Sequence, residues 1–188
     1  MIPEDNAGRW PPVYDFKELG KQIKKLVADG SIFNQFYHLK VDTNEFFQGD
    51  VLLLDNNPFY IDKEGDISLL EGEFKHWLIL GNTCDLARDS SGTIPHLTHI
   101  TPIIPIREDI PANLLSDLKK YKLYKKLYLP DWNGGLVHYY IDLTLINSVE
   151  KTYLVNHAQI AARLHFKTWL LLHSCLVRYL ARDDGRHD

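Results

Sequence analysis

The chain contains few of the residues that mark several common classes of protein. Its 188 residues include two cysteines, Cys84 and Cys175, which lie far apart in the sequence. Two such cysteines provide no disulfide framework, and we expect free thiols in a reducing cytoplasm. The longest strongly apolar run, 169–172, is far shorter than the roughly 20 residues that cross a bilayer. Because residues 1–5 also lack the basic and apolar segments of a signal peptide, we expect a cytoplasmic protein without membrane contact.

Positive charge is also scarce. The 21 Lys and Arg residues are outnumbered by 25 Asp and Glu residues, which gives a formal net charge of −4. A protein that coats nucleic acid through its overall field needs a large excess of cations, so any nucleic-acid site must be a local basic patch. The sequence has neither a glycine-rich phosphate loop nor the Gly-x-Ser-x-Gly motif of serine hydrolases. We expect no cofactor.

Aromatic residues, in contrast, are plentiful, with ten Tyr, eight Phe and four Trp. They favour β-strands and aromatic-lined surfaces. The hydrophobic fraction of 45% and the charged fraction of 24% are ordinary for a globular protein. The length is that of one domain with an elaboration. We therefore expect an extended arm over 1–13 and a single domain over 14–188.

The spacing of hydrophobic residues changes along the chain from helical to strand-like and back. A helix is predicted to follow Asp15, which can cap it, and to end near Gly30. Short segments with strand-like spacing, separated by turn signals, predict a small barrel core over about 46–107. Its strands are expected over 51–55, 59–61, 67–70, 77–81 and 99–106.

The rest of the chain is predicted to pack on this barrel as a helical extension over about 108–188, which makes the fold class α+β. Pro102 and Pro105 fall within the last barrel strand and predict an edge position or a bulge there. The elements expected after Pro111 are a helix that ends before Pro130, a strand over 136–141 and a long helix over about 157–182.

Three short motifs in the barrel segment follow one another in a definite order. Gly49-Asp50 opens an apolar run, Gly72-Glu73 precedes the strand expected over 77–81, and Ile104-Pro105-Ile106 comes later. In this order they resemble the PemK/MazF toxin family over about 46–107. The resemblance implies an SH3-like barrel, an RNA or DNA target, a homodimer, and a protein partner such as an antitoxin or defence component. With its added helices, the chain resembles proteins of toxin–antitoxin and phage-defence systems.

The sequence departs from the family members that cut RNA at two positions. Those members have an Arg-Pro before the second long strand, where this chain has Lys75-His76, and a Thr or Ser where this chain has Arg107. Phosphodiester cleavage needs a cation and a general base. Lys75, Arg88 or Arg107 can supply the cation, and His76 or Asp85 the base. Enzymatic activity is therefore left open, with an endoribonuclease-like reaction as the enzymatic hypothesis.

A polar cluster with Cys84 and Asp85 follows one of the expected strands. A thiolate activated by a nearby histidine would make a Cys-dependent hydrolase, whereas a buried Cys84 beside a capping Asp85 is the structural alternative. The same pair with histidines has the residue types of a metal site. No metal is expected, because no paired-Cys or His-Glu-x-x-His motif is present. The histidines in the flanking segments are His76, His96 and His99.

The segment 119–128 interleaves five Lys with three Tyr. Such cations can neutralise phosphates while the rings stack on unpaired bases, which predicts binding of RNA or DNA. A helix would place the lysines and tyrosines on different sides, so a solvated amphipathic helix is the alternative. A second functional hypothesis is a non-catalytic protein-interaction module that uses the barrel and the C-terminal helix. The candidate nucleic-acid-binding residues are Lys119, Lys120, Lys122, Tyr124, Lys125 and Lys126.

Overall fold

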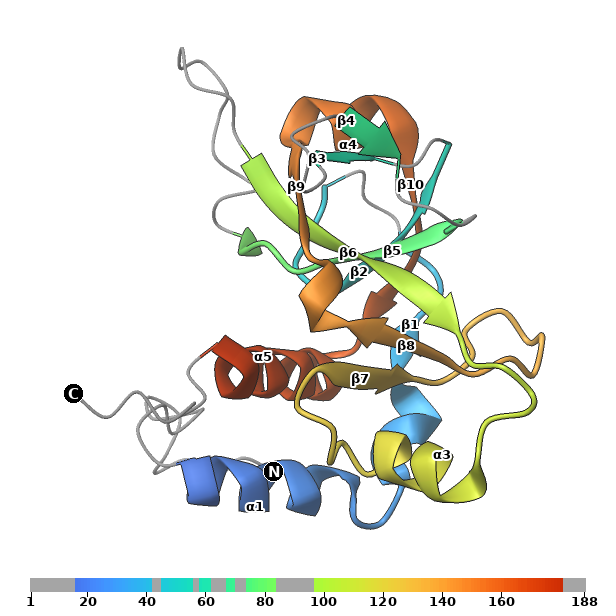
Figure 1. Ribbon diagram of the computed structural model, residues 1–188, viewed down its shortest axis with the longest axis vertical. Helices are drawn as coiled ribbons and strands as arrows, with labels where there is room; N and C mark the ends of the chain where they lie inside the picture. The colour runs from blue at the N-terminus through green and yellow to red at the C-terminus, as the bar shows by residue number, and fades with distance from the viewer. Residues whose placement is uncertain are drawn as a thin grey trace.

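The protein has a mixed α+β structure in which helices flank a curled antiparallel sheet (Figure 1). This confirms the predicted α+β class. The predicted arm over 1–13 lies outside the residues that the structure describes. The structure, a computed structural model, describes residues 16–41, 45–55, 58–61, 67–69, 74–83 and 97–180.

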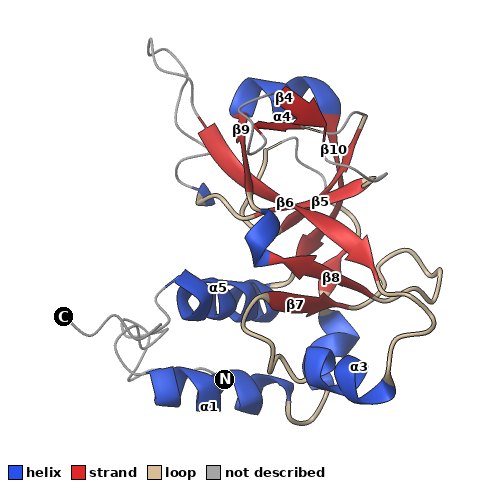
Figure 2. Cartoon of the chain, in the orientation of Figure 1, coloured by secondary structure: helices blue, strands red, loops and turns tan. Residues whose placement is uncertain are grey.

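Helices lie at both ends of the sheet (Figure 2). α1 and α5 pack side by side at one end, and α4 connects two strands at the other. None of the helices in the described ranges is long and apolar enough to span a membrane. The helices are α1 (Phe16–Val27), α3 (Ala112–Lys119), α4 (Lys151–His157) and α5 (Phe166–Leu180), with 3-10 turns at Ser31–Gln35 and Leu143–Leu145.

The strands form one large sheet and one hairpin. They are β1 (Tyr37–His38), β2 (Asp50–Leu54), β3 (Phe59–Ile61), β4 (Ile67–Leu69), β5 (His76–Ile79), β6 (Leu97–Pro105), β7 (Lys126–Leu129), β8 (Tyr139–Asp142), β9 (Asn147–Glu150) and β10 (Ala158–Leu164). Among the described residues the large sheet has eight strands in the order β1-β10-β2-β5-β6-β8-β7, with β9 also paired to β6. β3 and β4 pair separately as a hairpin.

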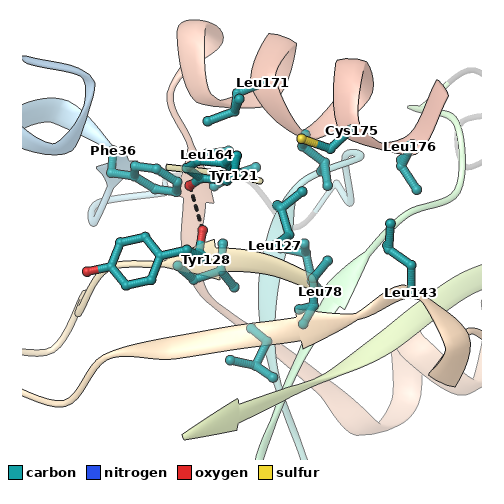
Figure 3. Packing of buried hydrophobic residues seen from close by; sticks show 14 of the residues in the cluster. Phe36, Leu78, Tyr121, Leu127, Tyr128, Leu143, Leu164, Leu171, Cys175 and Leu176 are labelled. Carbon is teal, nitrogen blue, oxygen red and sulfur yellow. Dashed lines mark hydrogen bonds between the residues drawn. The ribbon is translucent and has the colours of Figure 1, made fainter. Parts of the chain in front are cut away.

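The central strands bury side chains on both faces of the sheet, because apolar residues occupy successive positions along them. Val51 and Leu78 belong to a core cluster shared with α1 and α5. Their neighbours Leu52 and Trp77 belong to a second cluster, on the α4 side. Figure 3 shows Leu171, Cys175 and Leu176 of α5 on the side of the sheet that carries Leu127 and Leu78, with Leu143 of the 3-10 turn beside them. The sheet is therefore a rigid platform on which loops can be positioned.

β6 is a central strand, so the edge position predicted from Pro102 and Pro105 is wrong. β6 pairs with β5 on one side and with both β9 and β8 on the other. Its pairing with β9 ends at Ile100 and its pairing with β8 begins at Ile103. Pro102, which has no N–H to donate, lies in the gap between these two partners. Pro105 is the last residue of the strand.

The predictions of both C-terminal helices are partly wrong, because strand pairing overrides the helical spacing of the local sequence. α3 ends at Lys119, and Lys126–Leu129 instead forms β7 against β8. The long helix predicted from about 157 begins only at Phe166, since Ala158–Leu164 forms β10 between β1 and β2. The chain after 108 therefore contributes four strands to the sheet as well as helices.

Candidate nucleic-acid interface

The Lys- and Tyr-rich segment forms a helix end, a loop and an edge strand rather than one helix. The loop, residues 120–125, connects α3 to β7 and is called the 120–125 loop below. Three backbone N–H groups, those of Lys120, Tyr121 and Lys122, donate back to carbonyls of α3. Tyr121 has a φ of 52°, which is strained for a residue with a side chain. Its hydroxyl donates to the Tyr128 carbonyl at 2.6 Å (Figure 3).

Arg178 of α5 supports the 120–125 loop from inside the protein. The Arg178 side chain is 7% exposed, and it donates to the Tyr121 carbonyl at 2.9 Å and to the Leu123 carbonyl at 3.5 Å. Its guanidinium lies 4.9 Å from the centre of the Tyr124 ring, within the range of a cation–π interaction. The conformation of the loop is therefore fixed by buried contacts.

Tyr124 is 58% exposed. Its ring lies against the Arg178 guanidinium and is exposed enough for a flat ligand to reach it. Lys120, Lys122 and Lys125 beside it are exposed as well. Lys122 pairs with Asp117 at 2.7 Å. The loop thus combines an aromatic ring with several cations at one surface.

The two lysines that flank the loop lie over tyrosine rings of the sheet. The ammonium group of Lys119 is 5.7 Å from the centre of the Tyr128 ring, and that of Lys126 is 4.8 Å from the centre of the Tyr140 ring. Tyr128 and Tyr140 are opposite one another on β7 and β8, so their side chains share a face. Lys119, Lys120, Lys125 and Lys126 form no ion pair within the described ranges.

His138 joins this group of residues, although sequence reasoning did not select it. Its Nδ1 atom is 2.8 Å from the Tyr128 hydroxyl. Burial lowers the pKa of His138, and nearby Lys119 lowers it further, whereas Asp131 raises it. Burial also raises the pKa of Tyr128 to about 12. The strand predicted over 136–141 includes His138, but the sequence gives no information about the partner of this histidine.

Of the candidate catalytic residues, the structure describes Lys75, His76 and Arg107, and no hydrogen bond, ion pair or ring contact joins one of these three to another. His76 is half-buried against Trp132, with ring centres 5.2 Å apart. Burial lowers the pKa of His76, as does Lys75, which is itself exposed. Arg107 lies on the surface and pairs with Asp109 at 2.9 Å. Cys84, Asp85, Arg88 and His96 lie outside the described residues, and His99 is an exposed residue of β6.

The Gly49-Asp50 motif has a structural role in this protein. Gly49 has a φ of 91°, and a Cβ atom there would lie 3.0 Å from the Leu164 side chain. Asp50 is fully buried and accepts two hydrogen bonds from Arg163, at 2.6 and 2.8 Å. It also accepts one from the backbone N–H of Phe47. The motif therefore ties the start of β2 to β10.

The end of β5 is held by a similar polar network. The Gln48 backbone N–H donates to the Thr83 hydroxyl at 3.0 Å, and the Gln48 side-chain amide donates to the Leu80 carbonyl at 2.7 Å. The same amide accepts a hydrogen bond from the Trp169 indole at 3.0 Å. These contacts fix the described residues just before Cys84.

The described residues bear on metal binding and on the Cys175 thiol, whereas the candidate nucleophile Cys84 lies outside them. The described residues contain no group of three or more His, Cys, Asp or Glu residues placed to hold a metal ion. Cys175 is buried in the core, and burial raises the pKa of its thiol to about 12. A thiol with such a pKa is a poor nucleophile at neutral pH.

Two comparisons with known proteins identify no family for this chain. No protein-family model matches the chain, and no curated protein matches it.

Proposed function

We propose that the protein binds single-stranded RNA or DNA through the 120–125 loop and the adjoining strand β7. The observation that supports this most strongly is Tyr124, whose exposed ring is held on a rigid loop by buried Arg178. A ring that is fixed in place loses little entropy when a base stacks on it. Base–aromatic stacking accounts for much of the affinity of single-strand-binding proteins.

The surrounding charge suits the same ligand. Lys120 and Lys125 are exposed and, within the described ranges, form no ion pair with an acidic group. They can contact phosphates and release counterions. Because the net charge of the chain is −4, attraction would have to come from a local basic surface such as this one. We therefore expect an unpaired strand to bind better than a duplex, whose stacked bases cannot reach Tyr124.

Two variants with a matched control test this function. In Tyr124→Ala the affinity for a fluorescent single strand should fall roughly 5- to 150-fold, equivalent to about 1–3 kcal/mol of stacking. In Lys120→Ala/Lys125→Ala the slope of log affinity against log salt should decrease by about 1.4, since each phosphate contact contributes about 0.7. The control is Lys24→Ala/Lys25→Ala on α1, which removes the same charge from another exposed surface. Equal losses in both double variants would exclude the loop as the site.

A PemK/MazF-like barrel remains the best hypothesis for the ancestry of the fold. Gly49-Asp50 at the start of β2 supports it, as does the antiparallel order β2-β5-β6 in a curled sheet. Gly72-Glu73 lies outside the described residues. The proposed setting, a toxin–antitoxin or phage-defence system, depends on this resemblance. RNA cleavage is not part of the proposal, because no hydrogen bond or ion pair joins His76 to Arg107 among the described residues, and Cys84 and Asp85 lie outside those residues.

A protein-interaction module is the second candidate, and the loop between β7 and β8 favours it. Leu136 in that loop is 90% exposed and has a φ of 58°. Asp131 fixes the loop by accepting hydrogen bonds from the backbone N–H groups of Asn133 and Leu136. A strained, exposed apolar residue on a fixed loop suits contact with a protein surface. Leu136→Ser should leave strand binding unchanged and weaken only such a contact.

A further inference from the structure

Lys119, Tyr128 and His138 form a cluster that the stacking site does not use. We infer that this cluster binds a phosphate monoester at the end of a nucleic-acid strand. The inference rests on the proposed function, because the strand whose end binds the cluster is the one that stacks a base on Tyr124.

The cluster is built where three elements meet. Lys119 is the last residue of α3, Tyr128 lies in β7, and His138 directly precedes β8. The Lys119 ammonium lies over the Tyr128 ring at 5.7 Å, and the Tyr128 hydroxyl lies 2.8 Å from His138 Nδ1. α3 packs against β7. The cation and the imidazole therefore both lie against Tyr128, and Lys119 is near enough to His138 to lower its pKa.

The hydrogen bond between Tyr128 and His138 orients the imidazole for an anion. The pKa of Tyr128, raised to about 12, keeps its hydroxyl protonated at neutral pH, so this hydroxyl can donate to Nδ1. A neutral imidazole that accepts at Nδ1 carries its proton on Nε2. His138 Nε2–H and the Lys119 ammonium then provide donors to phosphate oxygens, and charge-assisted bonds of this kind are the stronger ones.

An acidic residue near the cluster, Asp131, already accepts hydrogen bonds from its own loop. Asp131 acts on His138 electrostatically, but its carboxylate accepts hydrogen bonds from the backbone N–H groups of Asn133 and Leu136 at 3.1 and 2.9 Å. These hydrogen bonds hold the Asp131 carboxylate within its own loop. Within the described ranges, Lys119 forms no ion pair. An incoming dianion can therefore pair with Lys119 without displacing an acidic side chain.

The position of the cluster favours a strand end over an internal phosphate. The 120–125 loop precedes β7, whereas Tyr128 is near the other end of β7 and His138 follows the connecting loop. Lys126 and Tyr128 are two residues apart on β7, so they share a face. A strand that runs from Tyr124 along β7 meets the fixed loop around Asp131, and its terminal phosphate comes to lie beside His138. A terminal phosphate carries close to two charges at neutral pH, more than an internal one.

The test compares three fluorescent strands of one sequence, with a 5′-phosphate, a 3′-phosphate or hydroxyl groups at both ends. We expect one of the two phosphorylated strands to bind the full chain roughly tenfold more tightly than the hydroxyl strand. Lys119→Met and His138→Phe should abolish this preference, so that each variant binds the three strands with equal affinity. Lys122→Met, which removes a lysine already paired with Asp117, should retain the preference.

Equal binding of all three strands would overturn the inference and leave the proposed function intact. An independent measurement uses inorganic phosphate alone, with the His138 Cε1–H resonance as the readout. Millimolar phosphate should shift this resonance in the wild type and shift it less in Lys119→Met. An unmoved resonance would overturn the inference even if no strand bound, and the wild-type measurements remain decisive if a variant fails to fold.

Discussion

Arg178 is a single buried cation that joins α5 to the surface loop proposed to bind nucleic acid. Its guanidinium donates to two loop carbonyls and stacks under Tyr124. Its Nε atom is buried and has no hydrogen-bond partner among the residues that the structure describes. Removing the guanidinium leaves the carbonyls of Tyr121 and Leu123 without these donors, and unmade buried hydrogen bonds are costly. The rigidity of the loop therefore depends on a residue more than 50 positions away in the sequence.

Replacing the buried Arg178 should destabilise the protein more than replacing an ordinary surface arginine. Arg178→Met should lower the free energy of unfolding by about 2–3 kcal/mol, because two carbonyls lose their donor. Arg107→Met is the control, since Arg107 forms only an exposed pair with Asp109 and should change stability by less than about 1 kcal/mol. Urea unfolding of both variants measures the difference. Equal effects of the two changes would contradict the assigned role.

At the scale of elements, the start of β2 shows how backbone conformation fixes one strand against another. Gly49 has a positive φ and lies against Leu164, and Asp50 pairs with Arg163 of β10. A side chain at Gly49 would be strained both by its backbone angle and by contact with Leu164. This junction brings the first barrel strand and the last strand of the sheet together.

Two glycine substitutions provide a matched test of this junction. Gly49→Ala should lower the free energy of unfolding by about 1–3 kcal/mol because of the strained φ. Gly20→Ala, in α1 with open space around the position, should raise it by about 0.5–1 kcal/mol, since Gly is unfavourable within a helix. Thermal or urea unfolding gives both values. A neutral Gly49→Ala would show that the junction relaxes easily.

The elements that the sequence could predict are those whose local pattern and tertiary environment agree. The helix after Asp15 and the strands at 59–61 and 67–69 were predicted closely, because capping residues and turn signals mark their limits. β10 was mistaken for helix because its Ala-rich sequence suits a helix locally, whereas pairing with β2 decides its conformation. β7 was also predicted as helix, and its pairing with β8 likewise decides its conformation.

The sequence could predict which Lys and Tyr residues belong to the candidate site, but not the contacts that hold them in place. The six Lys and Tyr residues selected for nucleic-acid binding do gather around one loop and its flanking elements. Arg178 and His138 were missed, because their contacts with Tyr124 and Tyr128 join segments that are distant or cross-strand. Such contacts depend on the register of β7 and β8, which no local pattern specifies.

At the scale of the whole molecule, several partly buried histidines make stability depend on pH. Burial lowers the pKa of His76, His138 and His173 below the ordinary value of 6.5. The unfolded chain therefore binds more protons than the folded one just below that value. Their stabilising contribution is complete above about pH 6.5 and is lost as the pH falls through the unfolded pKa towards the lower folded values.

We expect the free energy of unfolding to decrease between pH 7.5 and pH 5.5. Urea unfolding at several pH values measures this, with ionic strength held constant. His173→Phe removes one of the three groups and keeps an aromatic ring against Trp169, so it should flatten the pH dependence. Stability that stays constant or increases on acidification would contradict the buried, neutral state of these histidines.

The most direct test of the account is the affinity of the whole protein for a labelled single strand at low salt, beside a duplex of the same sequence. The account predicts saturable binding of the single strand that weakens as salt increases, with weaker binding of the duplex and a marked loss in Tyr124→Ala. No binding of the single strand at low salt, or binding that Tyr124→Ala leaves unchanged, would contradict it.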